Sequence, residues 1–303
     1  MFKRSASRRR AQPRGLRGPA ALATLVLGLS FGGGATAESI LFVGNSFTFG
    51  AASPVWKYRA DSVADLNRGG VGGVPALFKL FTQQAGLDYA VSLETAPGTD
   101  LDFHIQQKTP LIDRAWDHVI LQSYSTLDRD KPGDAADLVR SAPTLARMFR
   151  ARNPRVEVRL MATWSRADET YLSRGHWYGK PIGAMARDVR AGYDLAAAAS
   201  PAIRGVIPVG EAWNRAFDAG VADANPYDGL QAGQVDLWAH DRYHASTYGY
   251  YLEALVVFGA VTGRDPRTLG GRETAAVELG LSPAQAIALQ QVAQDELAAQ
   301  PRR

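Results

Sequence analysis

The chain of 303 residues contains 34 Lys and Arg, 30 Asp and Glu, and no cysteine. The lack of cysteine excludes disulfides, thiolate metal sites and a lipid-carrying N-terminal cysteine. Seven basic residues and no acid lie in residues 1–37, so the rest of the chain holds 34 − 7 = 27 basic against 30 acidic residues, and its net charge is −3 instead of +4. The basic balance of the full chain therefore gives no evidence for a nucleic-acid partner.

The first 37 residues have the order of a secretory signal peptide. A basic stretch over 1–18 precedes an apolar run over 20–31, which is too short to span a bilayer, and Ala35-Thr36-Ala37 gives a small-x-small cleavage site. A disordered basic arm that binds nucleic acid would explain neither the apolar run nor Ala-x-Ala. We expect a periplasmic or secreted protein. Ser7-Arg8-Arg9 leaves the twin-arginine route open beside Sec, although the usual Phe-Leu does not follow.

Residues 38–303 are predicted to form one domain, because no repeat or linker divides them and 46% of the whole chain is apolar. Beyond the leader, no segment reaches the ~20 apolar residues of a membrane helix. Short apolar runs predict buried strands at 39–43, 89–94, 118–122, 156–161 and 204–209. Helical patterns are found at 75–86, 137–151, 183–199 and 246–262, and a last helix begins with Ser282 and Pro283. This alternation predicts an α/β fold with three α/β/α layers and a parallel five-stranded sheet.

Two stretches fit this alternation poorly. Residues 50–74 include the glycine-rich run 68–73, but no Gly-Lys-Ser/Thr follows it, so a loop near the site is favoured over a phosphate-binding loop. Residues 218–240 are rich in Asp, Gly, Asn and Gln and predict a long loop that leads to the site.

Reactive and polar residues follow the predicted strands, at the edge where open α/β sheets bind ligands. Ser46 follows the first strand, and Asp241 and His244 form an Asp-x-x-His pair before a helix. A serine nucleophile, a histidine base and an aspartate that orients it make up a catalytic triad. The other strand ends carry Gly98, Gln122 and the run Thr163-Trp164-Ser165.

With these residues the chain, from 39 to about 263, resembles the SGNH (GDSL-type) hydrolase superfamily, whose fold is flavodoxin-like. That superfamily has a serine after the first strand, a glycine after the second, an Asn after the third and Asp-x-x-His near the C-terminus. Ser46 lies in Gly-Asn-Ser instead of the commoner Gly-Asp-Ser. The third block departs further, because Leu121-Gln122-Ser123-Tyr124 replaces Gly-x-Asn-Asp. A Gln at this position resembles a poorly characterised bacterial branch of the superfamily, which has Gly-Asn-Ser-Phe-Thr in the first block and Leu-Gln at the end of the third strand.

The resemblance implies a serine esterase, here exported, that cleaves the O-acyl ester of a small molecule or glycan and needs no metal or organic cofactor. Its catalytic residues would be Ser46, Asp241 and His244. The oxyanion hole would combine the N–H groups of Ser46 and Gly98 with the Gln122 amide. Asn45 and Trp164 are candidates for substrate binding.

Alternatives remain for the activity and for single residues. One alternative is a lipase or thioesterase, since both activities occur in the superfamily. Another is a binding protein that keeps the fold but has lost catalysis, and the replacement of Asn by Gln122 in the third block is its only support. A metal site formed by His240, Asp241 and His244 lacks a fourth ligand. Trp164 is equally compatible with a place in the core. His104 is expected at the surface at the start of a helix, Asp168-Glu169 in a solvated loop and Glu211 in the first turn of a helix.

Overall fold

The central sheet has six parallel strands in the order β2-β3-β1-β4-β5-β6, so β1 lies inside the sheet and β6 at one edge. The computed structural model describes residues 10–12 and 37–301, and the predicted signal peptide falls almost entirely outside them. The strands are β1 (Glu38–Gly44), β2 (Ala64–Asp65), β3 (Tyr89–Thr95), β4 (His118–Leu121), β5 (Glu157–Ala162) and β6 (Ile203–Pro208).

The five predicted strands are confirmed, each within about one residue at either end. The sixth strand, β2, was not predicted, because it has only two residues inside the loop 50–74 and pairs only with β3. Without β2 the sheet has the order β3-β1-β4-β5-β6, which is the flavodoxin-like order. The predicted fold class is therefore correct and the predicted number of strands is one too low.

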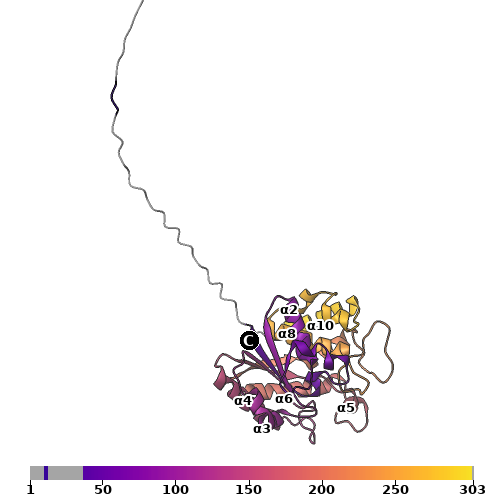
Figure 1. Ribbon diagram of the computed structural model, residues 1–303. Coiled ribbons are helices and arrows are strands. Elements are labelled where there is room, and N and C mark those ends of the chain that lie inside the picture. The colour runs from indigo at the N-terminus through magenta and orange to yellow at the C-terminus, as the bar shows by residue number, and fades with distance from the viewer. Residues whose placement is uncertain (1–9, 13–36, 302–303) are drawn as a thin grey trace, which may run out of the picture. The chain divides into compact units, whose positions relative to one another are not determined.

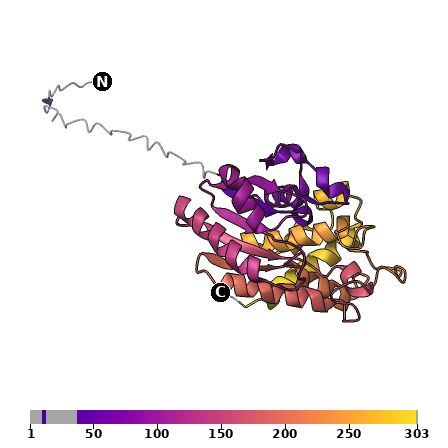
Figure 2. The ribbon, with the colours of Figure 1, turned by 90° about the horizontal axis from the view of Figure 1, so that it is seen from below.

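Helices cover both faces of the sheet, as Figure 1 shows, with α2, α8 and α10 on one side and α3, α4 and α6 on the other. In Figure 2, α4 and α6 run side by side, in agreement with their direct packing. The predicted helices correspond to α2 (Gly73–Gln84), α4 (Ala136–Arg152), α6 (Gly183–Ala198), α8 (Thr247–Thr262) and α10 (Pro283–Ala299). No bounds were predicted for α1 (Ser46–Phe49), α3 (Leu101–Ile112), α5 (Ala167–Tyr171), α7 (Val209–Asp218) and α9 (Thr274–Glu278), or for three short 3₁₀ helices at Pro54–Lys57, Ala60–Ser62 and Pro266–Leu269.

Alternate side chains of β1 enter two separate cores. Ile40 and Phe42 pack with α2, α7, α8 and α10, whereas Leu41 and Val43 pack with α3, α4 and α6. A strand that is buried on both faces has a continuous apolar sequence, which is why this one was predictable. Within the described residues, no helix is both long and apolar enough to cross a bilayer.

The carboxyl ends of the inner strands meet at one edge of the sheet. Gly44 pairs with Thr95 of β3, and Val43 pairs with Leu121 of β4. The segment after β1 leads to α2 on one face, and the segment after β3 leads to α3 on the other face. The chain thus changes face beside β1, and a ligand crevice is expected there.

Candidate active site

Ser46 is the first residue of the short helix α1, directly beyond the end of β1. Asn45 caps this helix, because its Oδ1 accepts the N–H of Phe47 at 3.1 Å. The N–H of Ser46 belongs to the first helical turn, where the helix itself supplies no acceptor. A Cβ on Gly44 would lie 2.4 Å from Thr48 Oγ1, so the tight turn before Asn45 needs glycine.

Asp241 and His244 form a hydrogen-bonded pair in the loop before α8. His244 Nδ1 lies 2.7 Å from Asp241 Oδ2, while Asp241 Oδ1 accepts the backbone N–H groups of His244 at 3.0 Å and Tyr243 at 3.2 Å. Burial acts to raise the pKa of Asp241, but these hydrogen bonds outweigh it and lower the pKa below its usual value. The carboxylate is therefore charged at neutral pH and fixes the orientation of the imidazole.

His244 presents a free nitrogen at the other side of its ring. Its Nε2 is buried and has no hydrogen-bond partner among the described residues. Burial lowers the pKa of His244 below 6.5, and the contact with Asp241 opposes this effect only in part. The imidazole is therefore neutral at neutral pH and able to accept a proton at Nε2.

The loop that carries this pair is attached to the end of β5 by two tryptophans. Trp164 Nε1 donates to Tyr243 O, and Trp238 Nε1 donates to Ser165 O, both at 3.0 Å. The structure places Trp164 in the core, where it is fully buried and stacks on Trp213 with ring centroids 4.5 Å apart. Trp164 therefore fixes the His244 loop from within and does not line the pocket.

Ser46 and His244 line the same pocket, of about 410 Å³. The side chains of Phe49, Trp56 and Pro97 give it an apolar wall. The remaining lining residues are Asn45, Phe47, Ala51, Gly98, Tyr124, Ser125, Arg166 and Tyr243. No hydrogen bond joins Ser46 Oγ to His244 Nε2 within the described residues, and such catalytic contacts are often long without substrate.

Gly98 contributes backbone to this pocket from the turn after β3. Its φ of +66° lies in the left-handed region, which favours glycine. Its carbonyl accepts a hydrogen bond from Arg129, and the next carbonyl, of Thr99, accepts Asn45 Nδ2 at 2.8 Å. The Gly98 turn and the Ser46 turn are therefore tied together.

Gln122 lies beneath the pocket and does not line it. The side chain is fully buried, and its Oε1 accepts Asn45 N–H and the Thr48 hydroxyl, both at 2.9 Å. Its Nε2 donates to Ser123 O. The side chain of Asn45 is also committed, because Nδ2 donates to Thr99 O and Ser123 O and Oδ1 caps α1.

Other candidate residues have structural contacts. His104 was expected at the surface, but it is fully buried between Glu94 and Thr99, so that prediction was wrong. Asp168 was expected in a solvated loop, yet it lies in α5 and pairs with Arg166 at 2.7 Å. Glu211 lies in the first turn of α7, as predicted.

The structure offers no metal centre in the part of the chain that it describes, since it holds no group of three or more His, Asp or Glu side chains placed to bind an ion. His240 is exposed. Asp241 and His244 instead bond to each other.

Several lining residues had not been singled out from the sequence, among them Trp56, Ser125, Arg166 and Tyr243. The last three lie within four residues of a predicted site residue or strand end, so proximity to a strand end was the available signal. Trp56 belongs to the loop 50–74 that was expected near the site, and its side chain is 43% exposed.

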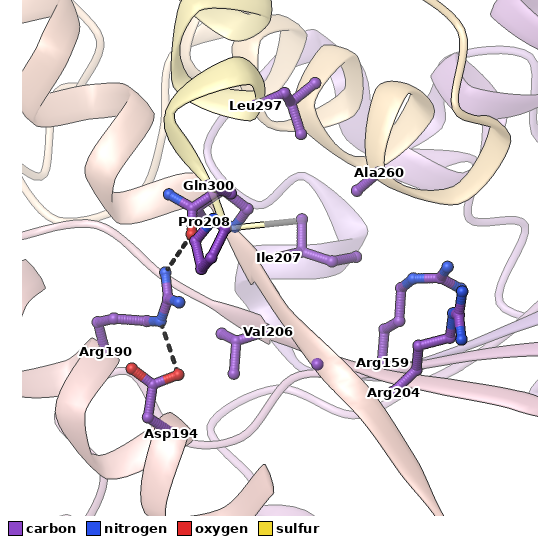
Figure 3. Close-up of a pocket in the computed structure, with 12 residues that line it drawn as sticks. Arg159, Arg190, Asp194, Arg204, Val206, Ile207, Pro208, Ala260, Leu297 and Gln300 are labelled. Carbon is purple, nitrogen blue, oxygen red and sulfur yellow. Dashed lines mark hydrogen bonds and ion pairs between the residues drawn. The ribbon is translucent and has the colours of Figure 1, made fainter. Parts of the chain in front are cut away.

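A second pocket, of about 230 Å³, lies along the edge strand β6 (Figure 3). It shares none of its lining residues with the pocket of Ser46. Arg190 pairs there with Asp194 and Glu211, while Arg159 and Arg204 both pair with Glu157. Its arginines are thus neutralised by their own neighbours.

No known family model matches the chain, and no curated protein matches it. Solved structures do match. A DUF4886 family protein from Bacteroides uniformis superposes with a TM-score of 0.60 at 19% identity, over 87% of this chain and 95% of the other. A protein from Parabacteroides merdae that is named for a likeness to GDSL lipases has a TM-score of 0.52 at 16% identity, over 75% and 95%.

The chain shares the fold of these proteins. Because both identities are low, the likeness shows the fold alone. It confirms the expected flavodoxin-like fold, with a parallel sheet between two layers of helices.

Proposed function

We propose that the protein is a serine esterase that cleaves an O-acyl ester. The observation that carries this proposal is the Asp241–His244 pair, whose buried and unpartnered Nε2 lines one pocket with Ser46. The shared fold with a protein named for GDSL lipases supports ester hydrolysis over other serine chemistry.

The proposed reaction begins with proton transfer from Ser46 Oγ to His244 Nε2. Oγ attacks the ester carbonyl carbon and forms a tetrahedral intermediate, and Asp241 holds the imidazolium through Nδ1. The imidazolium then donates its proton to the leaving alcohol as the C–O bond breaks. A water molecule that is deprotonated by His244 attacks the acyl-enzyme, and Ser46 is released with the acid.

The N–H groups of Ser46 and Gly98 are the proposed donors to the negatively charged oxygen of this intermediate, each typically worth ~3 kcal/mol. Both residues line the pocket. The Gln122 amide is the third donor expected from the sequence, but Gln122 does not line the pocket, and one of its two Nε2 N–H groups is bound to Ser123 O.

The substrate that we propose has a short acyl group. A pocket of about 410 Å³ lies near the lower end of the ~300–1,000 Å³ that is usual for ligand sites, which favours a short-chain ester over the long chains of a lipase or thioesterase. The exposed ring of Trp56 at this pocket supports a carbohydrate ester, because an aromatic face can stack on a sugar. Export remains part of the proposal and rests on residues 1–37 alone.

A fluorophosphonate probe tests the nucleophile directly. We expect the probe to label a protein that consists of residues 38–303, with the adduct on Ser46. The variants Ser46→Ala and His244→Ala should not be labelled. The same proteins are assayed with short-chain and long-chain aryl esters and with acetylated sugars. An adduct on Ser123 or Ser125, or wild-type turnover by Ser46→Ala, would contradict the assignment.

A further inference from the structure

Arg166 brings a guanidinium group into the pocket of Ser46. Its side chain is only 14% exposed, and two of its three nitrogens are already bound. Nε lies 3.1 Å from one oxygen of Asp168, and Nη2 lies 2.7 Å from the other oxygen of that carboxylate. This two-point contact fixes the plane of the guanidinium group.

The third nitrogen, Nη1, is left for the pocket. Among the described residues its one hydrogen bond is a long one, of 3.4 Å, to Ser125 Oγ, and both residues line the pocket. A guanidinium Nη carries two N–H donors, so at least one donor is unused. The ring of Tyr243, 4.6 Å from Arg166 Cζ, packs against the guanidinium and limits its movement.

The charges around Arg166 favour a neutral ligand. Its cation is paired with Asp168, and Glu169 Oε1 lies 3.8 Å from Nη2, so this group of three side chains has a net charge of −1. An anionic substrate would meet this excess negative charge. A neutral oxygen would accept a hydrogen bond from Nη1 without that repulsion.

We propose that Arg166 Nη1 and Ser125 Oγ form a subsite that binds a neutral oxygen acceptor of the substrate, an ether or hydroxyl oxygen close to the ester. The preferred substrates are then neutral, oxygen-rich esters, rather than alkyl esters or esters with a carboxylate. This inference rests on the proposed esterase function and defines its substrate class.

Isosteric ester pairs test the subsite. One pair, n-butyl acetate and 2-methoxyethyl acetate, differs by an oxygen in the alcohol. A second pair, ethyl butanoate and ethyl methoxyacetate, differs by an oxygen in the acyl group, and 3-acetoxypropanoate supplies the anionic analogue. The measured quantity is the ratio of kcat/KM within each pair, by pH-stat titration. Comparison between enzyme variants removes the intrinsic difference in reactivity within a pair.

Arg166→Met removes the donor, whereas Arg166→Lys keeps a cation for Asp168 but loses the planar fork. We expect both variants to lower the preference for the oxygen-containing ester about tenfold or more in one pair, as befits the loss of a hydrogen bond from a charged donor. Ser125→Ala should lower the same preference by a smaller factor. Arg190→Met is the matched control, because Arg190 is also a largely buried, ion-paired arginine but lies outside this pocket.

The outcomes separate the subsite from the esterase activity. A preference that survives in the Arg166→Lys variant in both pairs overturns the subsite, as does an equal loss of activity toward all five esters. Faster cleavage of 3-acetoxypropanoate than of 2-methoxyethyl acetate overturns the charge argument. If the wild-type protein cleaves none of the esters and Ser46 takes no probe, the proposed function itself is wrong.

Discussion

At the scale of single residues, Gln122 holds the turn that presents Ser46. Its Oε1 accepts two buried donors, the N–H of Asn45 and the hydroxyl of Thr48. A buried donor that loses its acceptor costs about 1–3 kcal/mol. The position of Ser46 therefore depends on a side chain that does not line the pocket.

We expect Gln122→Ala to lower both kcat and the melting temperature. The loss in kcat should be about a hundredfold, the size that is typical of disturbing an oxyanion site, with little change in KM. The melting temperature should fall by several degrees, since a loss of ~1 kcal/mol in the free energy of unfolding lowers it by about 2–4 °C in a domain of this size. Steady-state kinetics and calorimetry measure the two effects.

Two further variants define how Gln122 acts. Thr48→Val removes one donor together with its need for an acceptor, so it should affect stability less. Gln122→Asn should not restore full activity, because the shorter side chain cannot reach both donors. A hundredfold loss of kcat with no change in melting temperature would show instead that the amide acts directly on the intermediate.

At the scale of elements, α3 holds the Gly98 turn through a buried histidine. His104 Nδ1 is bonded to Glu94 at the end of β3, and its Nε2 lies 3.2 Å from Thr99 Oγ1. The Thr99 hydroxyl also donates to Ala96 O at 2.8 Å. This chain of contacts spans the turn on both sides of Gly98.

We expect Thr99→Val to lower kcat more than tenfold and to leave KM nearly unchanged, because the Gly98 N–H matters most when the oxyanion forms. A boronic acid analogue of the intermediate should lose affinity by a factor similar to the loss in kcat. Thr82→Val is the control, since Thr82 is a buried threonine whose hydroxyl also bonds a backbone carbonyl. Equal effects of the two variants on kcat would leave His104 and Thr99 with a structural role only.

The helices and strands differ in how well they could be predicted from the sequence. The strands β1 and β4 were predictable, because burial on both faces requires continuous apolar runs. The extent of helix α3 was not, because polar residues fill its middle and Pro110 lies inside it. Its buried face is formed partly by His104, whose partner Glu94 is ten residues away on β3.

The candidate site was also predictable only in part. The strand-end rule brought Ser46, Gly98 and the Asp241–His244 loop to one edge without any knowledge of contacts. It could not show that Gln122 turns inward or that Arg166 faces the pocket. Those orientations depend on Thr48 and Asp168, which are partners in the folded state and not a pattern in the sequence.

At the scale of the whole molecule, one core contains an acid that the proposed mechanism does not use. Glu253 lies on α8, is fully buried, and neither of its carboxylate oxygens has a hydrogen-bond partner among the described residues. Burial raises the pKa of Glu253 well above its ordinary value. The folded protein therefore binds a proton at Glu253 more tightly than the unfolded chain does, and stability is lost as the pH rises above about 4.5.

We expect Glu253→Gln to remove this pH-dependent loss, because the amide is neutral at every pH. Melting temperatures of the variant and the wild-type protein should be similar near pH 4 and should diverge as the pH rises, with the variant higher by at least about 2 °C at pH 8. Glu278→Gln is the control of opposite sign. Hydrogen bonds from Arg59 and Tyr58 lower the pKa of Glu278 to about 2, so its contribution is present at neutral pH and that variant should melt lower. A lower melting temperature for Glu253→Gln at pH 8 would show that the buried carboxylate is charged and bound to a partner in the folded protein.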